Sequence, residues 1–181
     1  MKKVLALVLV LMIALTASAF AADQLALLPP AMTSPFYASC IEGATPVAEA
    51  LGYELTVMAP ESEDDYATQT SMMEDLLTQG VKGIAVCGIN LDALIPAIKK
   101  ANEAGVPVVM FNTITEIEGA DVYAYSGYNQ YNGGANIADW VNEQTGGEAV
   151  VAIIEGLPSD YTTQRMGGFV DKCAAEYPNI K

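Results

Sequence analysis

Polar and aromatic residues gather at five places in the chain, each just after a short apolar run. These places are rich in aromatic rings, amides and hydroxyls and poor in paired carboxylates. Such groups recognise a neutral polar molecule, whereas acid–base catalysis needs positioned titratable groups. The five segments are residues 33–37, 88–90, 112–113, 125–129 and 156–165. Their composition predicts a recognition site.

Three side chains in these segments have distinct chemistry. Phe36 and Tyr37 can pack an aromatic ring against the C–H face of a sugar. Phe36 fits equally well as the first member of the apolar stripe of a following helix. Arg165 is the only arginine, and its planar fork of donors suits a polar ligand. In so acidic a chain a surface salt bridge explains Arg165 equally well.

Composition excludes several function classes. The 181 residues contain no histidine, which excludes Ser-His-Asp and Cys-His catalysis and histidine-ligated zinc. Eight basic against 22 acidic residues give a net charge of −14, so no nucleic-acid partner is expected. Gly133-Gly134 lacks the full phosphate-binding spacing and favours close helix packing. The acidic residues 61–65 lack calcium-loop spacing and indicate a solvated helix start. We therefore expect no metal and no cofactor.

The N-terminus has the pattern of a secretory signal. Lys2 and Lys3 precede the apolar run Val4–Leu15, and Ala19-Phe20-Ala21 offers a cleavage site after Ala21. The run is too short to span a membrane, so no membrane insertion is expected after cleavage. The expected location is periplasmic or secreted.

The three cysteines are far apart in sequence. Cys40 and Cys173 lie on apolar helical stripes, and Cys87 ends an apolar run. No C-x-x-C pair occurs, so neither a redox nor a zinc motif is present. Export would allow pairing, but these positions predict that all three are buried thiols.

Short apolar runs alternate with helical stripes. The expected strands are Gln24–Leu28, Tyr53–Met58, Lys82–Cys87, Val106–Phe111, Val122–Ser126 and Ala149–Ile154. Between the first four, apolar residues recur at three-and-four spacing, which predicts helices. A loop over residues 127–134 precedes a further helical stripe, and the last helix is expected over residues 166–177. This alternation predicts a doubly wound parallel α/β sheet, in which ligands bind beyond the carboxyl ends of the strands.

Residue types at the helix ends agree with this pattern. Gly52, Gly80 and Gly105 each follow a helical stripe, where a left-handed C-terminal position favours glycine. Asn90 and Asp64 stand where helix N-caps are expected.

Several segments together resemble a known family. They are SPFY (34–37), ALGY (50–53), QGVKGIAV (79–86), AIKKANEAGVPVVMFN (97–112), YNQYNGG (128–134) and RMGGF (165–169). With the export signal, they resemble periplasmic sugar-binding proteins of the ribose-binding type, which have the type I periplasmic binding fold. The resemblance implies two α/β lobes that close on a sugar. Residues 22–126 would form the N-terminal lobe without its return segment. Residues 127–181 would begin the C-terminal lobe, as in a C-terminally truncated fragment.

The resemblance also implies a ligand-binding set. It comprises Ser34, Phe36, Tyr37, Asn90, Asn112, Tyr128, Asn129 and Arg165. It favours the ligand role of Arg165 and places both aromatic rings of the SPFY segment on the sugar. Four places depart from the pattern: Asn112 stands where aspartate is common, Tyr128 is bulky where a small hydroxyl residue is common, Asn129-Gln130 replaces the usual Asp-Asn, and Asn90 lies two places beyond the usual asparagine. The sugar class is therefore implied, and a particular sugar is not.

The leading hypothesis is an exported, monomeric solute-binding protein that captures a monosaccharide or similar polyol for the permease of an ABC importer. An alternative is a sensor subunit that binds a sugar or a sugar-derived signal and docks on a membrane receptor. An exported α/β enzyme is less favoured, because histidine and a nucleophile elbow are absent. A sugar-responsive repressor would need a DNA-binding headpiece where the export signal stands.

Overall fold

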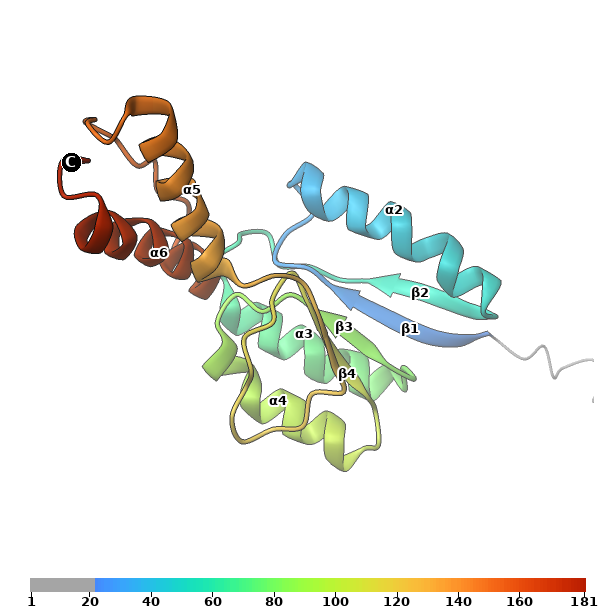
Figure 1. Ribbon diagram of the computed structural model, residues 1–181. Helices are drawn as coiled ribbons and strands as arrows, with labels where there is room; N and C mark the ends of the chain where they lie inside the picture. The colour runs from blue at the N-terminus through green and yellow to red at the C-terminus, as the bar shows by residue number, and fades with distance from the viewer. Residues whose placement is uncertain (1–21) are drawn as a thin grey trace, which may run out of the picture.

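A five-stranded parallel sheet forms the centre of the structure, a computed structural model that describes residues 22–181 (Figure 1). The predicted signal sequence lies outside the described residues. The strands are β1 (Asp23–Leu28), β2 (Tyr53–Val57), β3 (Ile84–Val86), β4 (Val108–Phe111) and β5 (Ala124–Ser126), in the order β2-β1-β3-β4-β5. The helices are α2 (Pro35–Ala50), α3 (Tyr66–Gln79), α4 (Leu91–Glu103), α5 (Gln130–Thr145) and α6 (Asp160–Glu176). The predicted parallel α/β fold is confirmed.

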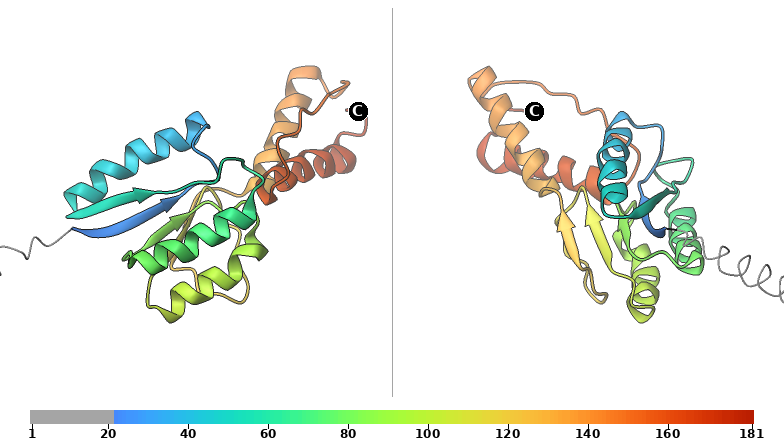
Figure 2. Two further views of the ribbon diagram at one scale, coloured as in Figure 1. Left: turned by 180° about the vertical axis from the view of Figure 1, so that it is seen from behind. Right: turned by 90° about the vertical axis from the view of Figure 1, so that its right-hand side faces the viewer.

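Helices cover the two faces of the sheet unequally. Helix α2 lies on one face, and α3 and α4 lie on the other (Figures 1 and 2). The main core forms on the α3–α4 side, where Leu28, Met73, Ile98 and Met110 are completely buried. Each such side chain contributes about 1.5–3 kcal/mol of burial free energy. On α2, by contrast, Val47 remains more than half exposed.

Local chemistry fixes the helix ends. Asn90 caps α4, because its side-chain oxygen accepts a hydrogen bond from the Ala93 N–H at 2.8 Å. The cap of α3 is Asp65, whose carboxylate accepts from the Thr68 N–H at 3.0 Å. The prediction of Asp64 was wrong by one residue, because that side chain instead accepts a hydrogen bond from Ser62. The three predicted C-terminal glycines do adopt left-handed conformations, with φ between 70° and 82°.

Helices α5 and α6 form a separate pair that stands beside the sheet (Figure 2). They enclose a small second core of Ala138, Cys173 and Ile180. Both helices begin earlier than predicted, at Gln130 and Asp160. Asn129 caps α5, and a reciprocal capping box between Ser159 and Thr162 begins α6. Their first turns are polar, so apolar spacing alone did not locate them.

The sixth predicted strand is not formed in residues 22–181. Ala149 makes an isolated parallel bridge with Ile180, the Val151 N–H donates to the Lys181 carbonyl at 2.6 Å, and residues 152–154 join no strand. A strand needs neighbouring backbone along its length, and here the neighbour is only the short end 179–181. Val150 and Ile154 are consequently 91% and 97% exposed.

The cysteines are free thiols, as expected, but their burial differs. Cys87 and Cys173 are buried, whereas Cys40 on α2 is only partly buried, so the prediction of burial was wrong for Cys40. Within residues 22–181, no helix is both long and apolar enough to cross a membrane.

Candidate functional site

The loops after β1, β3 and β4 meet at the carboxyl edge of the sheet, where an aromatic pair begins α2. Tyr37 is only 3% exposed, and its hydroxyl lies 3.6 Å from the Cys87 sulfur. Phe36 packs edge-to-face on Tyr37 with ring centroids 5.2 Å apart, yet it is 51% exposed. Phe36 therefore does not belong to the buried face of α2. The Phe36 ring is accessible to solvent and packs against the buried Tyr37 ring.

Asn112 lies beside this pair in an unusual backbone conformation. Its φ is +61°, in the left-handed region that asparagine tolerates better than most residues. The side-chain amide donates towards the Cys87 sulfur over 3.8 Å, and the backbone N–H donates to the Ser126 carbonyl at 2.8 Å. Burial raises the pKa of the Cys87 thiol to about 11 and also raises the pKa of Tyr37. Both groups therefore stay protonated at neutral pH.

A buried glutamine, which sequence analysis missed, fixes the turn after β3. The Gln69 amide donates to the Cys87 carbonyl at 2.9 Å, and its oxygen accepts from the Ile89 N–H at 2.9 Å. A Cβ atom at Gly88 would lie 2.7 Å from a side-chain methyl of Leu94, so a larger residue there would displace that side chain. No periodic pattern distinguishes Gln69 from the other polar residues of α3.

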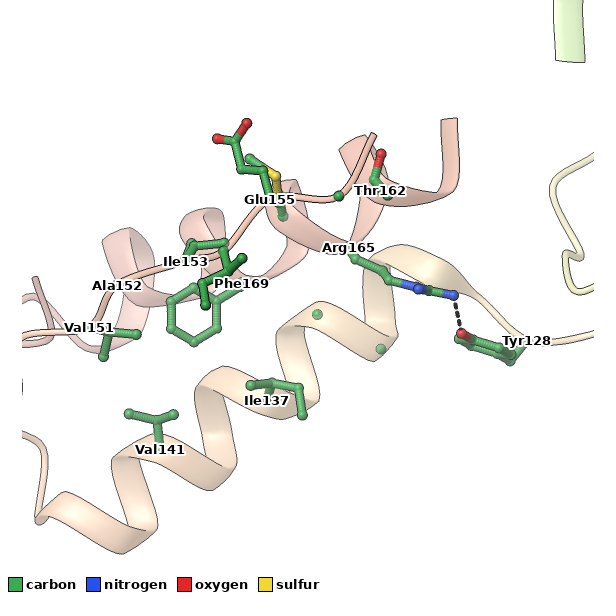
Figure 3. Close-up of a pocket in the computed structure, with 15 residues that line it drawn as sticks. Tyr128, Ile137, Val141, Val151, Ala152, Ile153, Glu155, Thr162, Arg165 and Phe169 are labelled. Atoms are coloured by element: carbon green, nitrogen blue, oxygen red, sulfur yellow. Dashed lines mark hydrogen bonds between the residues drawn. The ribbon is translucent and has the colours of Figure 1, made fainter. Parts of the chain in front are cut away.

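Arg165 projects from α6 into a set of neutral partners. Its Nε donates to the Gln130 side-chain oxygen at 2.6 Å, and a terminal nitrogen donates to the Tyr128 hydroxyl (Figure 3). The guanidinium carbon lies 5.6 Å from the Tyr128 ring centroid and 5.5 Å from that of Tyr161. Among the described residues Arg165 forms no salt bridge, so its positive charge is held by aromatic rings and an amide.

The first turn of α6 covers the strand ends. The Asp160 carboxylate accepts from the Leu91 N–H at 2.7 Å, and the Tyr161 hydroxyl donates to Glu63 at 2.9 Å. Burial, reinforced by Glu63, raises the pKa of Tyr161 to about 12. Glu63, predicted to be merely solvated, thus joins the α3 side of the site to α6.

The predicted ligand residues divide into two groups. Phe36, Tyr37, Asn112, Tyr128 and Arg165 present side chains around the strand ends, as described above. The others occupy N-cap positions of helices: Ser34 of α2, Asn90 of α4 and Asn129 of α5. The side-chain oxygens of both asparagines are already engaged in capping bonds.

A cavity of about 650 Å³ lies elsewhere, between α5, α6 and the segment 151–156 (Figure 3). Ile137, Val141, Val151 and Phe169 line it, and Arg165 stands at one end. Its walls are mostly apolar, so it is a poor match for a sugar. Among residues 22–181, no group of three histidine, cysteine or acidic side chains is placed to hold a metal ion.

The fold is a parallel α/β domain with aromatic and polar side chains at the carboxyl ends of its strands. Residues 25–181 match the periplasmic binding protein domain family, and the chain belongs to that family.

Known proteins agree with this assignment. The chain is 29% identical to the ribose import binding protein of Salmonella typhimurium over 99% of its length, and 29% identical to the D-allose-binding periplasmic protein of Escherichia coli over 78%. A periplasmic solute-binding protein from Actinobacillus succinogenes with bound D-allose superposes with a TM-score of 0.76 at 31% identity, over 88% of this chain and 57% of that one.

A solute-binding protein from Burkholderia graminis in complex with D-arabinose gives a TM-score of 0.77 at 26% identity, over 88% of this chain and 54% of that one. The chain spans 60% of the length of the Salmonella protein and 48% of the D-allose-binding protein.

Proposed function

We propose that this protein binds a monosaccharide or similar polyol outside the cytoplasm and presents it to the permease of an ABC importer. One observation supports the proposal above all. An exposed ring, a buried amide and an arginine that forms no salt bridge within residues 22–181 lie at the carboxyl edge of a parallel sheet. Relatives that bind ribose and D-allose support the same ligand class.

Each group has a chemical role in this proposal. Phe36, supported by Tyr37, packs on the C–H face of the sugar. Asn112 offers both a donor and an acceptor to hydroxyl groups, and Arg165 donates from its terminal nitrogens. These groups are suited to fix the orientation of a neutral polyol. The buried Cys87 thiol, with its pKa near 11, supplies no nucleophile at neutral pH.

The proposal includes closure of two units around the ligand. The main core lies in the sheet unit, over residues 22–126, and the small core lies between α5 and α6, in residues 127–181. Tyr161 and Arg165 come from the second unit, whereas Phe36 and Asn112 come from the first. A ligand that touches both sets stabilises the closed arrangement, which a permease can recognise.

Isothermal titration calorimetry of the full-length protein with a panel of aldopentoses, aldohexoses and polyols tests the proposal. We expect at least one compound to bind, and Arg165→Ala and Phe36→Ala each to weaken its binding about tenfold or more. Tyr123→Ala is the matched control, because Tyr123 is 79% exposed and precedes β5, at the amino end of that strand. Heat from no member of the panel, or equal losses in the control, contradicts the proposal.

A further inference from the structure

We propose that Gln130 is a positioning residue of the sugar site, which holds Asn112 and Arg165 in fixed relation to each other. This inference rests on the proposed function, because it assigns both partners to the ligand. Gln130 is the first residue of α5 and is only 1% exposed. It therefore acts on a ligand through its neighbours.

Both ends of the Gln130 amide are occupied. The nitrogen Nε2 donates to the backbone carbonyl of Asn112, and the oxygen Oε1 accepts from Arg165 Nε at 2.6 Å. A carboxamide combines a donor and an acceptor on one rigid plane, so both bonds form only in one orientation. The side chain thus connects the end of β4 to the middle of α6.

The backbone at Asn112 requires such support. Its left-handed conformation is held by the N–H bond to Ser126, by the close approach of Gly127 to Thr113, and by Gln130. A Cβ atom at Gly127 would overlap the Thr113 nitrogen, so the two chain segments cross in direct contact. Loss of the Gln130 donor frees the Asn112 carbonyl and allows the side-chain amide to reorient.

Arg165 needs support for a different reason. An arginine side chain has many rotamers, and ordering it on binding lowers affinity. Gln130 accepts from Nε and Tyr128 from one terminal nitrogen, which fixes the plane of the guanidinium before the ligand arrives. The remaining N–H groups of the fork stay available for hydroxyl oxygens.

Gln130→Met tests this role, because methionine is similar in volume and makes neither hydrogen bond. We expect sugar affinity measured by calorimetry to fall about tenfold or more, because both positioning bonds are lost. The control is Gln144→Met, on the exposed last turn of the same helix, which should leave affinity unchanged. A wild-type affinity in Gln130→Met overturns the proposal.

A double-mutant cycle separates positioning from general structural damage. In an Arg165→Ala background, Gln130→Met should weaken binding less than in the wild-type background, because the bond to Arg165 is already absent and only the bond to Asn112 is lost. The same tenfold loss in both backgrounds would show an effect independent of Arg165 and would overturn the proposal. Gln130→Glu keeps the acceptor for Arg165 and loses the donor to Asn112, so it should retain part of the affinity. If Gln130→Met does not fold, Gln130→Glu decides the question, and a loss as large as in Arg165→Ala contradicts the role.

A readout without sugar distinguishes failure of this inference from failure of the proposed function. Because the chain has one arginine, its Nε–H gives a single side-chain signal in a ¹⁵N NMR spectrum. Gln130→Met should shift that signal and speed its hydrogen exchange, whereas Gln130→Glu and Gln144→Met should preserve slow exchange. An unchanged signal in Gln130→Met overturns the inference. A changed signal in a protein that binds no sugar supports the coupling of Gln130 to Arg165 and contradicts the proposed function.

Discussion

Gly134 in α5 lies directly against the backbone carbonyl of Arg165 in α6, so a Cβ atom at Gly134 would overlap that oxygen. Gly168 in α6 meets the carbonyl of Tyr131 in α5 in the same way. The two helices therefore cross with their backbones in contact. This crossing sets the distance from which Arg165 reaches Gln130 and Tyr128.

Gly134→Ala should therefore destabilise the protein by about 1–3 kcal/mol, the usual cost of forcing a methyl group into a packed contact. It should also displace Arg165 and weaken sugar binding. Urea unfolding measures the first effect, and calorimetry the second.

Gly133→Ala is the matched control for the helix crossing. Its Cβ atom would meet the Tyr128 ring at 3.4 Å, which is an ordinary contact. Because alanine favours a helix interior over glycine, we expect unchanged or higher stability, by up to about 1 kcal/mol. Equal destabilisation by both substitutions would show that the close crossing is not the cause.

Asp65 should make the stability of α3 dependent on pH. Interaction with the Thr68 side chain, together with the hydrogen bond from the Thr68 N–H, lowers the pKa of the carboxyl below its ordinary value of 3.8. A lowered pKa in the folded state means that the stabilisation is complete above about pH 3.8 and is lost as the pH falls through the lowered value. Asp65→Ala should reduce the melting temperature by about 3 °C at pH 7, as for a lost N-cap.

The difference in melting temperature between Asp65→Ala and the wild type should shrink in acid and vanish below the pKa that Asp65 has in the folded state. Asp64→Ala is the control, since its exposed side chain only accepts a hydrogen bond from Ser62. Thermal melts of the three proteins from pH 7 to about pH 2 measure the effect. A constant difference across that range would contradict a role for the charged cap.

The three thiols should react in a fixed order. Cys40 is partly exposed, whereas burial raises the pKa of Cys87 to about 11, which leaves very little thiolate at pH 8. With a disulfide reagent at pH 8, one thiol should react in the folded protein and the other two only after denaturant is added. Cys40→Ser should abolish the early phase, and persistence of that phase would contradict the assignment.

Sequence patterns located the sheet accurately for two reasons. Its strands are apolar, and glycine or asparagine marks the ends of several helices that connect them. Each of the five observed strands begins within two residues of its expected start. The same criterion wrongly predicted a strand over Ala149–Ile154. An apolar run indicates that a segment can be buried, but a strand also needs a neighbouring strand to pair with.

Site residues were predictable only where their type is distinctive. Phe36, Tyr37 and Arg165 stand out in a chain with four phenylalanines and one arginine. Gln69 and Gln130 did not, because a glutamine gains its role from the backbone groups that the fold brings to it. Whether the predicted set contacts a sugar stays a prediction for the binding experiments above.

The extended segment 149–154 should make the protein bind apolar probes. Val150 and Ile154 are almost fully exposed, while Val151 packs against the small core of Ala138, Cys173 and Ile180. Exposed apolar side chains on an unpaired strand favour dye binding and self-association. We expect the protein to enhance the fluorescence of 1-anilinonaphthalene-8-sulfonate. The double substitution Val150→Lys and Ile154→Lys should reduce that enhancement by half or more. It should change the free energy of unfolding by no more than about 0.5 kcal/mol.

Val151→Lys is the contrasting variant for this segment. It places a charge against the small core and should destabilise the α5–α6 pair, so dye binding should rise rather than fall. Dye titration and urea unfolding of the three proteins give both quantities. If the double lysine variant binds as much dye as the wild type, the apolar cavity between α5 and α6 is the binding surface, and the exposed face of the segment is not.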